Sequence, residues 1–262
     1  MYHVFHQSRA KVEWAKKHIR DLHALIYDAT AQPHFYSLSV REDNLHVAIQ
    51  KGAFAEQVAL FIGDALHNLR SSLDILFCEV VNLCGGKDDR WTHFPICDTR
   101  EKVCVRLNKT LKERQITVGV RDFVSDTIKP YKAGNFSLWA LHQLNMMDKH
   151  QLLIPTIDAV CFLNVSLRNE KDEIIRHPII FADESCDIPL ARQNGRQFKL
   201  ENQGTVQVVV AFNLGTPYAG ERVLVSLKAI TEEVSRTIEA FEPLFAGAHS
   251  ASLAGTPCRE TR

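Results

Sequence analysis

Ionisable residues recur at helical spacing inside one strongly apolar segment, Gly63 to Asp74. Residues three and four apart share a helix face, so Asp64, His67, Arg70 and Asp74 would lie close enough to interact. Such a group could do acid–base chemistry: His67 would exchange protons beside a carboxylate, and Arg70 would hold an anion such as phosphate. The predicted catalytic residues are His67, Arg70 and Asp74, and the predicted binding residues of this segment are Asp64, Asn68 and Ser71.

The same pattern has a structural interpretation. The apolar neighbours, among them Leu66, Leu69 and Leu73, predict a helix that is buried over most of its circumference. Charged groups on such a helix are stable only when they are paired and hydrogen-bonded. The stripe would then be an internal ion network that fixes helix packing, and the spacing alone leaves both interpretations open.

A second polar cluster lies at the end of a later predicted helix, Leu141 to His150. Asp148, Lys149 and His150 are the further binding candidates, and in the functional interpretation Asp148 and His150 converge with His67 and Asp74. In the structural interpretation, Lys149 and His150 simply interact favourably with the negative end of the helix dipole.

Together the two segments resemble a group of uncharacterised bacterial proteins. The resemblance rests on Gly63-Asp64-x-x-His67-Asn68-Leu69-Arg70-Ser71-x-Leu73-Asp74 and, some distance later, Leu141-x-x-Leu144-x-x-x-Asp148-Lys149-His150. In that group the first segment usually continues Leu-Asp-His. The pattern is similar in turn to the HEPN superfamily of helical-bundle proteins, many of which are dimeric, metal-independent ribonucleases of toxin–antitoxin and phage-defence systems.

The HEPN resemblance implies specific roles, and the chain departs from one of them. Arg70 corresponds to the superfamily's arginine and Ser71 to the polar residue after it, whereas the histidine position holds Ile75. This histidine is the group expected to handle protons in RNA cleavage. Catalysis would therefore need His67, one turn upstream of Arg70, as a substitute.

Composition excludes several classes of protein. The 262 residues include 31 basic and 31 acidic side chains, a balance that argues against a surface devoted to nucleic acid or membrane. No apolar run reaches the roughly 18–20 residues of a membrane-spanning helix, and the first residues do not read as a signal peptide. The 7 cysteines are odd in number and lack a C-x-x-C pair, which favours reduced cytoplasmic thiols over disulfides.

Several motifs that would indicate other functions are missing. There is no glycine-rich phosphate loop, no G-x-S-x-G and no paired metal-ligand motif, so we expect neither a cofactor nor a metal. The segment 100–114 holds six basic and two acidic residues. This basic face could contact phosphates, although a solvated helix face is the simpler explanation.

Hydrophobic periodicity predicts the elements. Helices are expected over 8–29, 53–83, about 98–112, 120–128, 135–154 and 223–245, and strands over 36–40, 45–49, 161–167, 174–181 and 205–212. Asp98 and Glu101 form a candidate capping box, and Asn135 is a candidate helix cap.

These elements predict an α+β fold, a helical bundle with an antiparallel β layer formed by an N-terminal hairpin and C-terminal strands. We expect one domain over 1–246, with a helical core over 8–154, a β-rich part over 156–215 and a closing helix over 221–246, followed by a disordered tail over 247–262. The expected function is that of a HEPN-like, RNA-directed protein whose catalysis is unproven. We expect it to be cytoplasmic and to bind RNA or a partner protein, and it could form a homodimer. The alternative is a non-catalytic protein that binds a partner or a small ligand and whose polar stripe is structural.

Overall fold

The computed structural model describes residues 4–31, 36–41, 44–49, 52–114, 116–150, 156–182, 186–189 and 198–245. The chain divides into two compact units, and each is described by itself. The helical unit comprises Met1–Lys17, Asp64–Lys149 and Leu227–Arg262, and the sheet unit comprises His18–Gly63 and His150–Ser226. The prediction of one domain over 1–246 stays a prediction, and the predicted tail lies outside the described residues.

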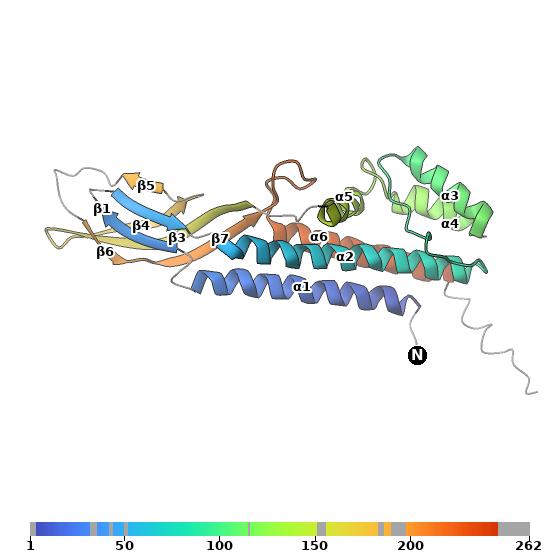
Figure 1. Cartoon of the computed structure of the whole chain (residues 1–262), viewed down its shortest axis with the longest axis horizontal. Coiled ribbons are helices and arrows are strands. Elements are labelled where there is room, and N and C mark those ends of the chain that lie inside the picture. The colour runs from blue at the N-terminus through green and yellow to red at the C-terminus, as the bar shows by residue number, and fades with distance from the viewer. Residues whose placement is uncertain are drawn as a thin grey trace, which may run out of the picture. The chain divides into compact units, whose positions relative to one another are not determined.

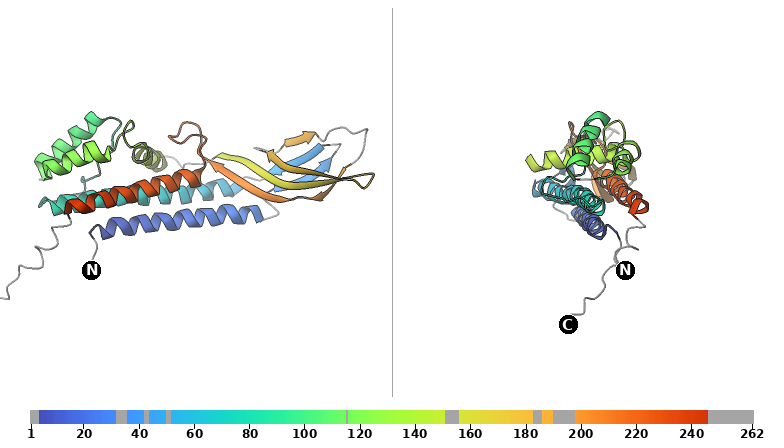
Figure 2. Two further views of the ribbon diagram at one scale, coloured as in Figure 1. Left: turned by 180° about the vertical axis from the view of Figure 1, so that it is seen from behind. Right: turned by 90° about the vertical axis from the view of Figure 1, so that its right-hand side faces the viewer.

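Parts of three long helices supply the centre of the helical unit: residues 6–17 of α1 (His6–Ala31), 64–83 of α2 (Gly52–Leu83) and 227–245 of α6 (Val223–Phe245). Within this unit they lie side by side, with α1 antiparallel to the other two (Figures 1 and 2). The ring of Phe5 packs edge-on against Phe241 and Phe245 of α6, and Ser8 of α1 donates a hydrogen bond to Glu79 of α2. α6 buries one apolar stripe, in which Leu227, Ile230, Val234 and Ile238 recur at helical spacing.

Two glycines follow the last turn of α2 and end the helix. Gly85 adopts a φ of +80°, a left-handed conformation that glycine reaches without the steric cost of a side chain. The amides of Gly85 and Gly86 then donate to the carbonyls of Asn82 and Val81 and satisfy the last turn.

Shorter helices complete this unit: α3 (Arg100–Arg114), α4 (Val118–Asp122), the π-helical η1 (Phe123–Ile128) and α5 (Phe136–His150). Asn135 caps α5 as predicted, since its Oδ1 accepts from the amide of Leu138 at 3.2 Å. The predicted cap of α3 was wrong by one residue. Thr99, and not Asp98, accepts from the backbone amide of Lys102, and Asp98 bonds instead to the side chains of Lys102 and Trp139.

The sheet unit contains two antiparallel sheets. The hairpin β1 (Tyr36–Arg41) and β2 (Asn44–Ile49) is extended by β5 (Cys186–Pro189) in the order β1-β2-β5. The second sheet has β3 (Thr156–Asn169) between β4 (Ile174–Ala182) on one side and both β6 (Phe198–Asn202) and β7 (Thr205–Ala211) on the other. The α+β class, the N-terminal hairpin and the C-terminal strands are thus confirmed, whereas β5 and β6 were not predicted.

One apolar core joins the two sheets. Leu38, Leu45 and Val47 of the first sheet share a buried cluster with residues of the second, and the ring of Tyr36 meets that of Phe162 at 5.4 Å between centroids. The residues that the second sheet contributes to this cluster include Val165, Leu167, Ile180 and Phe198. The alternation of these buried apolar residues with less buried ones is the period-two pattern that sets strand register.

Within the described part of the chain, no helix has both the length and the apolar character that a membrane crossing needs.

Candidate functional site

Arg70 and Asp74 form a buried ion pair on α2. The Nη1 atom of Arg70 lies 2.7 Å from Oδ1 of Asp74, and their side chains are 8% and 26% exposed. Their separation of four residues places them one helical turn apart on the same face. Burial lowers the pKa of Arg70, and the charge of Asp74 beside it offsets part of this effect.

Both members of this pair also bond to the backbone of one residue, Phe94. Nη2 of Arg70 donates to the Phe94 carbonyl at 3.0 Å, and Oδ1 of Asp74 accepts from the Phe94 amide at 2.9 Å. We call this ring of contacts the Phe94 clamp. It fastens the irregular segment after α2 to the helix, where buried backbone groups would otherwise lack partners.

The side chain of Phe94 anchors the same segment by packing. It is fully buried, and its ring meets Phe77 of α2 and Phe241 of α6 edge-on, with centroids 5.8 and 6.3 Å apart. Such aromatic pairs add about 0.5–1.5 kcal/mol beyond the area they bury. Arg70 is therefore surrounded by structural contacts.

A histidine that the sequence did not single out approaches the clamp from the surface. Nδ1 of His93 lies 3.6 Å from Oδ2 of Asp74, and the side chain of His93 is mostly exposed. The neighbouring residue Thr92 is buried. No periodicity predicts this approach, because His93 belongs to an irregular segment whose path is set by the Phe94 clamp.

His67 and Ser71 lie apart from Arg70. His67 is exposed on α2, and within the described residues its hydrogen-bonding contact is with Ser71, at 3.5 Å from Nε2 to Oγ. Asp64 is also exposed. Of the three predicted catalytic residues, the structure therefore brings Arg70 and Asp74 together and directs His67 elsewhere.

Asn68 is a buried connection between helices. Its Nδ2 donates to the Asp64 carbonyl at 2.8 Å, and its Oδ1 accepts from Nζ of Lys11 on α1 at 3.1 Å. At the end of α5, Asp148 is half-buried, whereas Lys149 and His150 are exposed. Lys149 belongs to the helical unit and His150 to the sheet unit.

A pocket of about 420 Å³ opens between the segment 96–98, the start of α3 and α5. Its polar lining comes from both helices: Asp98, Glu101, Lys102, Arg106, His142 and Gln143. Lys102 is engaged by Asp98 at 2.9 Å, whereas Arg106 makes a long bond of 3.5 Å to the Ile96 carbonyl. Arg106 thus keeps most of its donors for a ligand.

The imidazole of His142, which lines this pocket, has a pKa below its usual range. Burial, together with the positive charges of Arg70 and Arg106, lowers its pKa to about 4. The imidazole is therefore neutral at pH 7, and it offers one donor and one acceptor. The opposing Arg106 comes from a separate helix, which the residue spacing within α5 cannot locate.

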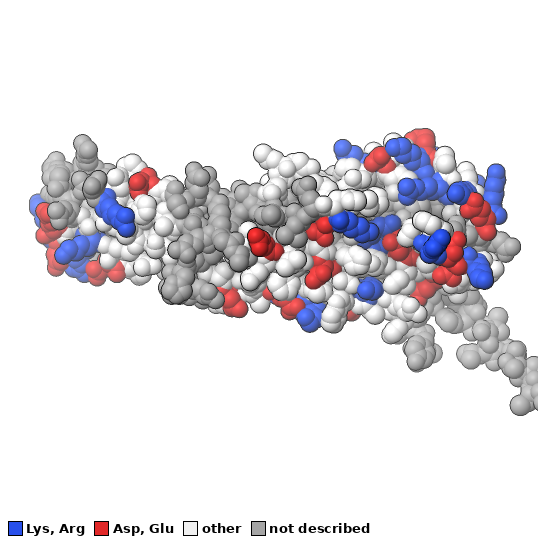
Figure 3. Space-filling view, viewed as in Figure 1, with Lys and Arg blue, Asp and Glu red and all other residues white. Residues whose placement is uncertain are grey.

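Half of the basic residues of α3 are paired with carboxylates. Arg100 pairs with Asp126, Lys102 with Asp98, and Lys109 lies 3.9 Å from Glu113. Figure 3 shows acidic and basic side chains mixed over the region of α3 and α4, without a continuous patch of one sign. Among the described residues, no group of three or more His, Cys, Asp and Glu side chains could hold a metal ion.

Comparisons with known proteins give no match: no protein-family model matches the chain, and neither a curated protein nor a solved structure does.

Proposed function

We propose that the chain is a non-catalytic binding protein that takes a small ligand with an anionic group, and that Arg70 and Asp74 serve the structure of its site. The observation that carries this proposal is the position of the Arg70 guanidinium, 8% exposed and held by Asp74 and the Phe94 carbonyl. To meet a phosphate of RNA, this guanidinium would have to leave a buried pair, which costs several kcal/mol when one charge is stranded.

The proposed ligand site is the pocket between α3 and α5. Arg106 supplies the group for the anion, because a guanidinium binds carboxylate or phosphate oxygens through a planar fork of donors. His142 and Gln143 provide neutral hydrogen-bonding groups on the facing helix. A neutral His142 beside Arg106 avoids the repulsion that a second cation would add at pH 7.

The Phe94 clamp gives Arg70 a role in this site. The clamp holds the start of the segment that continues through Ile96 and Cys97, which line the pocket. Further along, the amide of Cys97 donates to the Pro130 carbonyl at 3.1 Å and fixes the other end. Arg70 is thus a positioning residue for the pocket wall.

A titration of the 15N-labelled chain tests the ligand site. Inorganic phosphate, a nucleoside monophosphate and a dicarboxylic acid serve as probes, with Arg106→Gln as the test variant and Lys109→Gln, on the same helix outside the pocket, as its control. We expect a probe to shift the amide signals of Arg106, His142 and Gln143, and Arg106→Gln to weaken binding at least about tenfold, or 1.4 kcal/mol. Shifts confined to other residues, or equal affinities for the two variants, would contradict the site.

The second candidate is a HEPN-like protein that contacts RNA. The observation in its favour is the exposed side chain of Lys112 on α3, for which no carboxylate partner lies within the described residues. Cations free to meet phosphates are what such binding uses. In this candidate, a homodimer would bring two such faces to one RNA.

A further inference from the structure

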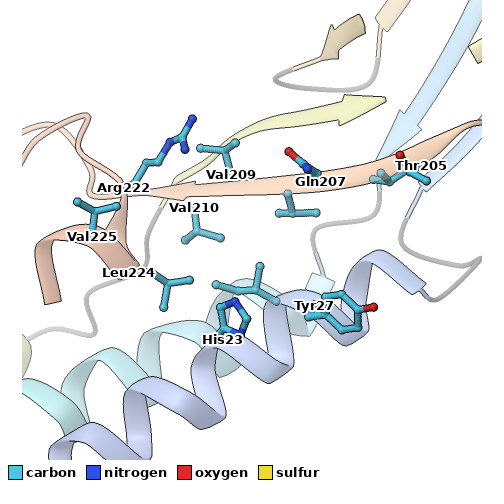
Figure 4. Close-up of a pocket in the computed structure, with 12 residues that line it drawn as sticks. His23, Tyr27, Thr205, Gln207, Val209, Val210, Arg222, Leu224 and Val225 are labelled. Atoms are coloured by element: carbon cyan, nitrogen blue, oxygen red, sulfur yellow. The ribbon is translucent and has the colours of Figure 1, made fainter. Parts of the chain in front are cut away.

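A groove of about 440 Å³ runs along β7 in the sheet unit. One wall is α1, which contributes His23, Ile26 and Tyr27, and the other is β7 itself (Figure 4). Arg222, Leu224 and Val225 close one end. All of these residues belong to the sheet unit, so the groove is a feature of that unit alone.

The groove follows the edge of β7. Its lining includes six consecutive residues, Thr205 to Val210. Successive side chains of a strand point to opposite faces, so a hollow over one face would meet only every second residue. Figure 4 shows both directions: Val210 points toward α1, whereas Gln207 and Val209 point away from it.

Over residues 205–210 that edge has no strand beside it in the described structure, and at its end Ala211 forms an isolated antiparallel bridge with Arg222. β7 pairs with β3 on one side, from Thr205 opposite Leu163 to Ala211 opposite Thr156, and no named strand pairs with its other side. Alternate amides and carbonyls of an edge strand point outward and are available to another chain. Natural proteins usually cover or charge such an edge, and here a groove runs beside it instead.

The groove walls combine exposed apolar surface with one cation. Tyr27 is 68% exposed and Val225 59% exposed, an arrangement that favours an apolar partner side chain. Arg222 is exposed as well, and among the described residues no acidic side chain lines the groove or pairs with it. The charge of the groove therefore complements a carboxylate.

We propose that β7 binds an extended segment of a partner protein, which adds to the sheet as a strand along the free edge of β7 and places a carboxylate against Arg222. Main-chain hydrogen bonds along β7 would give affinity, and Tyr27, Val225 and Arg222 would select the side chains.

A slender peptide fits this groove better than a second copy of the chain. α1 lies across the groove from β7, so a segment that pairs with the edge also meets the exposed Tyr27 of α1. The unmatched charge of Arg222 also calls for an acidic partner, which β7 of a second copy does not provide, since its sequence is TVQVVVA.

The test uses the full chain and a display library of random peptides as long as β7, which has 7 residues. The most enriched peptide is then measured by fluorescence anisotropy against wild type, Arg222→Gln and Arg20→Gln, an exposed arginine of α1 outside the groove. We expect an acidic peptide whose affinity falls at least about tenfold with Arg222→Gln and stays unchanged with Arg20→Gln.

Two further measurements separate strand addition from side-chain contact alone. A copy of the peptide methylated on alternate backbone nitrogens keeps its side chains but cannot pair, and it should bind at least about tenfold more weakly. Hydrogen exchange of residues 205–211 should slow when the unmodified peptide binds. Three results would overturn the proposal. The library could yield no enriched peptide, or the methylated copy could bind as tightly as the unmodified peptide. Alternatively, hydrogen exchange of residues 205–211 could slow only as the protein concentration rises, which would indicate pairing with a second copy.

Discussion

Arg70 and Asp74, one turn apart on α2, hold the carbonyl and the amide of a single residue, Phe94, at 3.0 and 2.9 Å. This geometry makes the most conspicuous charges of the sequence part of a backbone attachment. It also explains why an arginine is needed: a guanidinium has several donors in one plane, so it can meet Asp74 and a carbonyl together.

Removing Arg70 should destabilise the fold. Arg70→Ala strands the partly buried Asp74 carboxylate and leaves the Phe94 carbonyl without its donor, so we expect a loss of about 3 kcal/mol in the free energy of unfolding. Denaturant unfolding followed by circular dichroism measures this loss. Arg100→Ala is the matched control, because Arg100 pairs with Asp126 at the surface, where solvent screens the pair, and it should cost much less than Arg70→Ala. Equal losses in the two variants would mean that the clamp does not stabilise the helical unit.

Stability should depend on pH through His142. The folded-state pKa is about 4 and the unfolded value is 6.5, so between these values the unfolded chain binds a proton that the folded chain does not. The contribution of His142 is therefore constant above about pH 6.5, and stability declines as the pH falls toward about 4. Unfolding free energies at several pH values should show this decline in wild type and in His150→Gln, and a smaller decline in His142→Gln. A decline of the same size in His142→Gln would remove His142 as its cause.

The thiol of Cys78 should react slowly. Burial, with the nearby carboxylates of Asp88 and Asp74, raises its pKa to about 11, and its Sγ donates to the Thr92 carbonyl at 3.6 Å. Only the thiolate is nucleophilic, so the rate of iodoacetamide labelling at Cys78 should keep rising about tenfold per pH unit beyond pH 9. Peptide mass spectrometry measures this rate for each cysteine. A plateau near pH 9, where an ordinary thiol is ionised, would contradict the buried environment.

Gly204 should not tolerate a side chain. Its φ is +71°, and a Cβ atom there would stand 1.9 Å from the carbonyl oxygen of Leu163 on β3. Gly204→Ala must therefore displace the turn that leads into β7, with an expected cost above about 1 kcal/mol. Gly215→Ala is its control, since Gly215 also has a positive φ but meets no atom within 4 Å. Both variants carry the strain of a positive φ, but only Gly204→Ala adds a steric clash, so its thermal unfolding midpoint should be the lower of the two. Equal midpoints would show that the close approach to Leu163 does not affect stability.

Local patterns predicted most elements because each one carries its own signal. The apolar periodicity of α6, the glycines after α2 and the Asn135 cap are all readable within a few residues of the chain. Strands β5 and β6 were missed because they are short, with 4 and 5 residues, and because their pairing partners β2 and β3 are distant in sequence.

The candidate site was predictable only in part. Helical spacing correctly placed Arg70 beside Asp74, since both belong to one helix. It could not show that His67 is exposed on a different part of the helix surface, or that the partner of the pair is the backbone of Phe94. Those facts depend on contacts between segments, which one sequence without the fold does not specify.

The most direct test of the account is RNA cleavage by the purified chain, measured with and without a chelator for wild type, His67→Ala and Arg70→Lys. The variant Arg70→Lys keeps a positive charge but lacks the planar fork of donors that the Phe94 clamp uses. We predict no cleavage by wild type above that of a preparation carrying both substitutions, and a lower unfolding free energy for Arg70→Lys than for His67→Ala. Chelator-resistant cleavage by wild type that is lost in both single variants, each still folded, would contradict a structural role for Arg70 and support a ribonuclease.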